Sequence, residues 1–207
     1  MKSIREYINE RLHLTKDRVS KCKYFPKTKP ELEKIIKQLF DENGYDVDLN
    51  IIDTSKITDM SYLFDNTEFH KFCGDVSQWN VSNVENMDSL FFGCYDFDCD
   101  LSQWNVSQVE GMEFMFGGCE NFKGRGLEKW NVSKVKNMEA MFAKCKNLDC
   151  DLSHWDVSQV INMQHMFYRS NFSNDISSWK IKSNAATSKM FLKSPLENNP
   201  PAWYKDI

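Results

Sequence analysis

The cysteines and histidines are the residues of this 207-residue chain that could do the most chemistry. Nucleophilic catalysis needs a cysteine or serine beside a histidine that accepts its proton. The four histidines, His13, His70, His154 and His165, stand at unrelated positions of the repeat described below. Three cysteines recur at a position expected to face inward, where cysteine behaves as a small apolar side chain. We therefore expect no catalytic residues and predict that the chain is not an enzyme.

Metal binding is the second chemistry to weigh. The segments Asp98-Cys99-Asp100 and Asp149-Cys150-Asp151 are nearly identical, but the CxxC and HxxxH spacings typical of zinc sites do not occur. Five aspartates form one column of the repeat: Asp48, Asp75, Asp100, Asp151 and Asp175. They could chelate calcium, although aligned acids more often accept hydrogen bonds from backbone or tryptophan N–H groups at turns. We expect neither metal nor cofactor, with calcium left open.

The seven cysteines also bear on the cellular compartment. Their number is odd, and the first ten residues carry charges where a signal peptide needs an apolar stretch. No apolar run approaches the roughly 18 residues of a membrane span. We therefore expect a cytoplasmic protein with no membrane partner, in which Cys94, Cys119 and Cys145 form a ladder of reduced thiols.

A repeat must position these residues. All six tryptophans recur at intervals of 24 to 26 residues: Trp79, Trp104, Trp130, Trp155, Trp179 and Trp203. Columns of valine, methionine, phenylalanine and a small residue follow each tryptophan at fixed offsets, and Ile52 takes the tryptophan position of an earlier repeat. Such a period predicts stacked units that share one core, with the indole rings lying over one another.

Within a repeat, Val84, Met87, Leu90 and Phe91 have the spacing of the apolar face of a short helix, and Ser82 with Glu85 has the pattern of a capping box. The segment from Asp100 to Val106 has the character of a strand. The sequence therefore predicts an α/β repeat solenoid of the leucine-rich-repeat type, with one short strand and one short helix per repeat of about 25 residues.

The ends of the chain differ from the repeats. We predict an N-terminal helix (Ser3–Leu12) and polar link over residues 1–23, and a helical cap over 24–47 that begins at Thr28 and ends near Gly44. The repeats follow over residues 48–194. Residues 195–207 are expected to cap the C-terminal end, with Trp203 and Tyr204 closing the stack.

Three segments carry a family resemblance: Trp79-Asn-Val-Ser-Asn-Val-Glu-Asn-Met87, Met138-Glu-Ala-Met-Phe-Ala-Lys-Cys145 and Asp151-Leu-Ser-His-Trp-Asp-Val-Ser158. They resemble the BspA-like leucine-rich repeat family, including the short, unexported members found in gut bacteria and their phages. The resemblance implies a non-enzymatic binding protein and supplies no catalytic residues. Exported relatives bind host proteins at the cell surface, whereas this sequence shows neither a signal nor a lipid anchor.

Positions outside the repeated columns are free to specify a partner. Five of them carry aromatic rings that we expect on the helix-side edge as a partner-binding patch: Phe92, Tyr95, Phe114, His165 and Tyr168. The alternative is additional packing between neighbouring helices. A second candidate face comprises the residues before each tryptophan, Gln78, Gln103, Lys129 and His154, next to the acidic residues Glu110, Glu113, Glu120 and Glu128.

Together these observations predict an intracellular, non-enzymatic module that docks a protein partner on one face, of which a phage-encoded inhibitor of a host protein is one version. The alternatives are a small-ligand (nucleotide-type) binding or sequestering protein and a surface adhesin module. Residues 51–129 carry 5 basic and 14 acidic side chains, which argues against nucleic acid as a partner. The sequence leaves the oligomeric state open.

Overall fold

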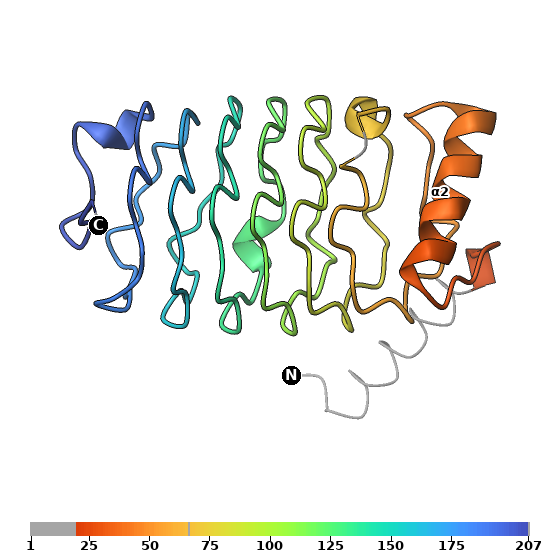
Figure 1. The fold of residues 1–207 in the computed structure, drawn as a ribbon, viewed down its shortest axis with the longest axis horizontal. Helices are drawn as coiled ribbons and strands as arrows, with labels where there is room; N and C mark the ends of the chain where they lie inside the picture. The colour runs from red at the N-terminus through yellow and green to blue at the C-terminus, as the bar shows by residue number, and fades with distance from the viewer. Residues whose placement is uncertain (1–19, 66, 207) are drawn as a thin grey trace, which may run out of the picture.

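The computed structural model describes residues 20–65 and 67–206, which form a row of irregular turns lying side by side (Figure 1). Helix α2 (Lys29–Asn43) covers one end of the row, and the C-terminus lies at the other. Three short 3-10 helices interrupt the turns: η1 (Phe69–Lys71), η2 (Leu127–Lys129) and η3 (Pro195–Glu197). The helix predicted over Ser3–Leu12 lies outside the described residues. Each repeat is named below by its tryptophan.

Helix α2 confirms the helix predicted before the repeats. The Thr28 hydroxyl accepts a hydrogen bond from the Glu31 N–H, and a proline stands in the first turn. Gly44, with φ of 85°, ends the helix. The apolar stripe is buried, and the Phe40 ring lies 5.0 Å from Phe69 and 6.2 Å from Phe64 of the first repeat. In the other repeats the preceding repeat buries such apolar rings. At this end of the row helix α2 takes that role.

The predicted α/β repeat solenoid, with a strand and a helix in each turn, is wrong. Over the described repeats the chain is mostly irregular, its helices are the short 3-10 segments named above, and its β structure consists of isolated bridges rather than strands. Five of these bridges join equivalent positions of successive repeats: Asp59–Asn86, Asn86–Gly111, Gly111–Asn137, Asn137–Asn162 and Asn162–Ala186.

The backbone hydrogen bonds explain why neither predicted element forms. In the segment predicted as a helix, the N–H groups of Met87, Ser89 and Phe91 donate to carbonyls of the next repeat at 2.9, 2.6 and 2.9 Å. The N–H groups between them, from Leu90 and Phe92, fold back onto carbonyls three residues earlier, at 3.2 Å each. This alternation satisfies the backbone without the i→i−4 bonds of a helix or the continuous ladder of a strand.

The predicted capping box is also wrong. The Ser82 N–H donates to the Asn80 side-chain oxygen at 3.2 Å, and the Glu85 N–H donates to the Thr58 carbonyl of the preceding repeat at 2.8 Å. An asparagine side chain that accepts the N–H two residues later forms an Asx turn. The serine therefore follows a turn and does not cap a helix.

Left-handed residues recur at one fixed position of successive repeats. Ten residues after the tryptophan position, six residues other than glycine have φ between 50° and 58°: Tyr62, Ser89, Phe114, Ala140, His165 and Lys189. This conformation costs a residue other than glycine about 1–2 kcal/mol. The hydrogen bonds to the neighbouring repeats hold it in place, since the N–H of Ser89 is one of those donors.

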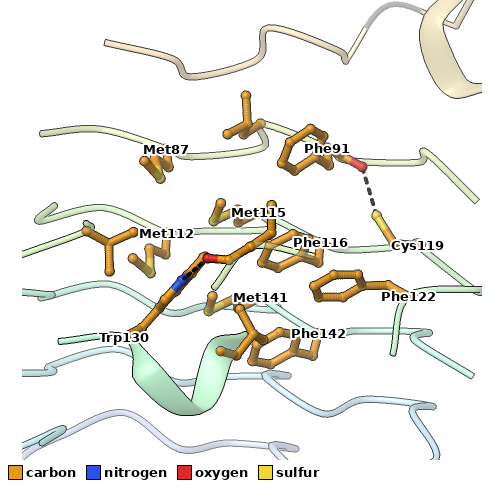
Figure 2. Packing of buried hydrophobic residues seen from close by; sticks show 14 of the residues in the cluster. Met87, Phe91, Met112, Met115, Phe116, Cys119, Phe122, Trp130, Met141 and Phe142 are labelled. Carbon is orange, nitrogen blue, oxygen red and sulfur yellow. Dashed lines mark hydrogen bonds between the residues drawn. The ribbon is translucent and has the colours of Figure 1, made fainter. Parts of the chain in front are cut away.

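The predicted stack of indole rings is confirmed from the Trp104 repeat onward. The ring centroids of Trp104, Trp130, Trp155, Trp179 and Trp203 follow one another at 6.3, 6.5, 6.5 and 6.0 Å. Each indole N–H also donates to a carbonyl of the preceding repeat, as Trp130 does to Leu101 at 3.2 Å (Figure 2). Every tryptophan therefore joins two repeats through its ring and through its N–H.

A second stack runs parallel to the first and is made of phenylalanines. The rings of Phe64, Phe91, Phe116, Phe142, Phe167 and Phe191 follow one another at 5.3 to 5.9 Å. Methionines such as Met112 and Met115 are fully buried beside these rings (Figure 2). The side-chain columns predicted from the repeat are thus the core, although the backbone conformation predicted to carry them is not.

The cysteine column is a ladder of buried thiols. Cys119 donates from sulfur to the Phe91 carbonyl of the preceding repeat at 3.0 Å (Figure 2). Cys145 donates in the same way to the Phe116 carbonyl at 3.1 Å. Cys94, Cys119 and Cys145 are buried and form no disulfide. Burial raises the pKa of the Cys119 thiol well above its usual range, so the sulfur stays protonated.

Over residues 20–65 and 67–206, no helix combines the length and the apolar character needed to cross a membrane.

Candidate functional site

Four of the five predicted partner-binding residues form two aromatic pairs in the structure, and the fifth, Tyr95, is exposed. We call Phe92, Tyr95, Phe114, His165 and Tyr168 the aromatic face. Phe92 and Phe114 come from adjacent repeats and meet edge to face, with ring centroids 5.7 Å apart. His165 and Tyr168 belong to one repeat and meet in the same geometry, also at 5.7 Å. Edge-to-face contacts fix the orientation of aromatic rings.

The two pairs share a register because they occupy equivalent positions. Phe114, Ala140 and His165 each stand ten residues after their tryptophan, and the Phe114 and Ala140 N–H groups donate to carbonyls of the following repeat at 2.8 Å. The intervening repeat carries the buried side chains of Ala140 and Ala143 ten and thirteen residues after its tryptophan, the positions of His165 and Tyr168 in the next repeat. The aromatic face is therefore two ring pairs separated by one repeat of small residues, and not one continuous patch.

Exposure differs along the aromatic face. Phe92 and Tyr95 are 37% and 42% exposed, whereas Phe114, His165 and Tyr168 are partly buried. The prediction that these rings lie on a helix-side edge is wrong, because no helix forms in these segments of the structure. The rings instead pack on one another across irregular turns, and each keeps part of its surface in contact with solvent.

Sequence reasoning missed two residues that extend the aromatic face. Tyr62, 56% exposed, stands ten residues after Ile52 and therefore at the same repeat position as Phe114. Arg169 follows Tyr168 and places its guanidinium 5.2 Å from the centre of that ring. Counting offsets from Ile52 would have found the tyrosine. The arginine had no such signal, since only aromatic residues were sought at the variable positions.

The second candidate face does not form one acidic surface. Gln78, Gln103, Lys129 and His154 are exposed, as predicted. However, the Glu110 carboxylate accepts a hydrogen bond from Lys136 at 2.6 Å, and Glu113 accepts one from Asn137 at 2.8 Å. Glu128 accepts the Gly126 N–H at 3.0 Å. These three carboxylates stand at different positions of the repeat, and each already accepts a hydrogen bond from a nearby residue. They therefore do not form a common binding surface, and we retain the aromatic face as the candidate site.

The residues considered for catalysis and zinc binding have other contacts. His165 packs on Tyr168, and the Cys99 thiol donates to the Asp75 carboxylate at 3.3 Å. Burial raises the pKa of Cys99 and of Cys150 to about 12. A protonated thiol is a poor nucleophile and a poor metal ligand. In the described part of the chain, no three His, Cys, Asp or Glu side chains gather as a metal site would require, and His13 lies outside that part.

The aspartate column forms turns. Asp48, Asp75, Asp100, Asp151 and Asp175 each accept the N–H of the residue two positions later, at 2.8 to 2.9 Å. Of the two alternatives left open, the hydrogen-bonding role is the one observed, and the donors are backbone N–H groups. The tryptophan N–H groups donate instead to backbone carbonyls.

These turns predict acid sensitivity. Hydrogen bonds from Ser102, Ser153 and Ser177 lower the pKa of Asp100, Asp151 and Asp175 below the usual value of 3.8. A lowered pKa in the folded state stabilises the fold above the unfolded pKa, and this stabilisation is lost as the pH falls through the folded pKa. We expect the midpoint of urea unfolding, measured from pH 6 to pH 2, to fall below about pH 5.

A matched variant isolates these carboxylates. Asn80 and Asn105 already form the same kind of turn elsewhere in the repeats. The triple variant Asp100→Asn, Asp151→Asn and Asp175→Asn should therefore keep the turns and show a shallower loss of stability in acid. Desolvation by burial raises the pKa of Glu113, which acts in the opposite direction in both proteins. An unchanged acid profile in the triple variant would assign the sensitivity to other groups.

Successive turns that share hydrogen bonds, stacked rings and buried side-chain columns define a repeat protein. Comparison with family models identifies the family: the model described as "Mycoplasma protein of unknown function, DUF285" matches residues 34–126 and 116–203. The chain belongs to this family. Searches among curated proteins and among solved structures give no match.

Proposed function

We propose that the chain is a non-enzymatic protein-binding module that docks a protein partner on the aromatic face. The observation that carries this proposal is the pair of edge-to-face contacts, Phe92 with Phe114 and His165 with Tyr168, on turns held in register. Partly exposed aromatic side chains are frequent hot spots of protein interfaces. Rings already fixed in position lose little conformational entropy when a partner binds.

We also infer that the chain is related to the BspA-like repeat proteins. The recurring segments around Trp79, Met138 and Trp155 support this relationship, and so does the match to a mycoplasma repeat family that spans residues 34–203 in two overlapping parts. Binding is the activity that this relationship favours. Partner recognition would then depend on the variable positions, because the repeated columns are buried and serve the core.

Site-specific photo-cross-linking tests the docking surface. A photoreactive phenylalanine analogue is placed at Tyr168, at Phe92 and, as a control, at the exposed Gln103 of the second candidate face. After irradiation in the native cell, we expect one defined adduct from positions 168 and 92 and none from position 103. An adduct from position 103 alone would move the site to the second face.

Alanine variants give the energetic test. Phe114→Ala and Tyr168→Ala are each expected to weaken binding of the cross-linked partner about 30-fold, the effect of an ordinary hot spot. Their free energies of unfolding should fall by no more than about 1 kcal/mol, because both rings are partly exposed. Binding would be measured with the purified partner and stability by urea unfolding. Unchanged affinity in both variants would exclude the aromatic face.

A further inference from the structure

Positive charge is concentrated next to the aromatic face at the C-terminal end of the row. Fourteen residues after their tryptophans, three successive repeats carry Lys144, Arg169 and Lys193, which we call the cationic column. All three residues are exposed. They lie on adjacent turns, since the N–H groups of Lys144 and Arg169 donate to carbonyls of the following repeats at 2.8 and 3.0 Å.

The cationic column occupies strained backbone. Lys144, Arg169 and Lys193 have φ of 63°, 55° and 61°, whereas the two preceding repeats place glycine at this position. Glycine takes this conformation without steric cost. The three residues also place like charges on neighbouring turns, which repel one another. Left-handed residues also occur ten positions after the tryptophans, where their side chains differ in kind, so the shared positive charge is what distinguishes the cationic column.

The two glycines show that the fold itself does not require cations here. A Cβ atom on Gly93 would lie 2.8 Å from the His70 ring, so this repeat has no room for a side chain. A Cβ atom on Gly118 would find its nearest neighbour at 3.4 Å, which is ordinary contact. The position therefore accepts glycine or a longer side chain, and the three C-terminal repeats all carry a positive charge.

No carboxylate of the described residues neutralises the cationic column. None of its three side chains forms an ion pair in this part of the structure. Arg169 lies over the Tyr168 ring, and Lys146 adds a fourth charge by donating to the Arg169 carbonyl at 2.7 Å. Glu197 accepts the backbone N–H of Lys193, not its ammonium group, at 2.9 Å.

We infer that the cationic column binds an acidic segment of the protein partner, next to the ring of Tyr168. This inference rests on the proposed function and names the chemistry of the partner. The three cationic residues lie on three adjacent turns, so the first and the last are separated by two turn spacings, or about 10 Å. About three residues of an extended peptide span this distance. Nucleic acid fits less well, because it needs an extended run of cations, and this positive surface ends after three repeats, where the preceding repeats carry Asp96, Asp98 and Glu120.

Two triple variants with the same loss of charge test the inference. Lys144→Gly, Arg169→Gly and Lys193→Gly remove the cationic column and relieve its strained backbone. Lys129→Ala, Lys134→Ala and Lys180→Ala remove three exposed charges elsewhere. Fluorescein-labelled deca-glutamate is the probe, and its anisotropy is measured at 50 and 300 mM salt. A DNA oligonucleotide of ten nucleotides is the competing probe, and melting temperatures are recorded for all proteins.

We expect deca-glutamate to bind the parent protein more tightly at low salt, as exposed charges require. The glycine variant should bind it about tenfold more weakly, the effect of three exposed ion pairs of ordinary strength, while the alanine control changes less than about twofold. The glycine variant should also melt no lower than the parent. This last result separates binding from a structural role, in which removal of the cations would destabilise the fold.

Several results would overturn the inference: no binding of deca-glutamate by the parent, equal losses in both variants, tighter binding of the oligonucleotide, or a lower melting temperature of the glycine variant. Cross-linking from Tyr168 distinguishes this failure from failure of the proposed function. A cross-linked partner that binds the glycine variant as well as the parent would keep the docking surface and reject its acidic chemistry. Binding of deca-glutamate without any adduct would reject the docking surface.

Discussion

Trp130→Ala should lower the free energy of unfolding by about 3–5 kcal/mol. The Trp130 ring stacks on Trp104 and on Trp155, with interplanar angles of 3° and 2°, and its N–H donates to the Leu101 carbonyl. Alanine removes both stacking contacts, opens a cavity in the core and removes one of the two donors to the Leu101 carbonyl, which also accepts the Trp104 N–H. Urea unfolding followed by circular dichroism measures the change.

Trp203→Ala is the matched control for this prediction. Trp203 is partly exposed and stacks on one tryptophan, Trp179, so its removal disturbs one interface between repeats where loss of Trp130 disturbs two. We expect a loss of about 1–2 kcal/mol. Trp130→Phe should fall between the two alanine variants, because it keeps a ring and loses the N–H donor. Equal losses for Trp130→Ala and Trp203→Ala would mean that the central stack does not couple the repeats.

Gly126→Ala should cost about 3 kcal/mol or more. Gly126 has φ of 93°, and a Cβ atom there would lie 2.2 Å from the Ser102 nitrogen and 2.5 Å from its Cα. Both atoms belong to the backbone of the neighbouring repeat and cannot rotate away. Alanine would therefore combine an unfavourable conformation with separation of two repeats, and urea unfolding would record the loss.

Gly118→Ala controls for the conformation alone. Its φ of 81° is similar, but its added Cβ atom would meet the Gly93 Cα at an ordinary 3.4 Å. Its cost should therefore stay near 1 kcal/mol. The excess cost at Gly126 measures how closely the two repeats approach where the longest interval between tryptophans, 26 residues, is accommodated. Equal costs at the two glycines would contradict this account.

The buried side chains could be predicted from the sequence because apolar residues recur at the same positions of successive repeats. Met112, Phe116 and Trp130 stand in columns that are apolar in nearly all repeats, with Thr187 an exception in the methionine column, and these columns form much of the core of the structure. Helix α2 was predictable for a different reason. Thr28 and Gly44 mark its two ends with residues that have a specific role there.

The backbone of the repeats could not be predicted in the same way. The spacing of Val84, Met87, Leu90 and Phe91 fits a helix, but turns that alternate between internal and neighbouring hydrogen bonds bury the same residues. The repeats also contain left-handed positions, for which glycine or asparagine is the usual signal. Phe114 and His165 occupy such positions and give no such signal.

The aromatic face was predictable as a set of residues and not as an arrangement. Equal offsets from the tryptophans placed Phe114 and His165 in one row, as the structure has them. The edge-to-face contact of Phe92 with Phe114 depends on the register between two turns. Backbone hydrogen bonds set this register, and the sequence does not reveal them. The cationic column depends on left-handed backbone at Lys144, Arg169 and Lys193, and was missed for that reason.

The hydrogen bonds between turns have a consequence for the length of the molecule. Each interior turn offers its successor the same donors and acceptors that it takes from its predecessor, so the repeats contain no stop signal of their own. Residues at the C-terminus supply one: the Lys189 N–H donates to the Asp206 carboxylate at 2.6 Å, and the Thr187 hydroxyl donates to the Lys205 carbonyl. The Lys189 N–H, which corresponds to a donor that bonds the following repeat elsewhere in the row, is thereby satisfied within the same chain and is closed to pairing with another molecule.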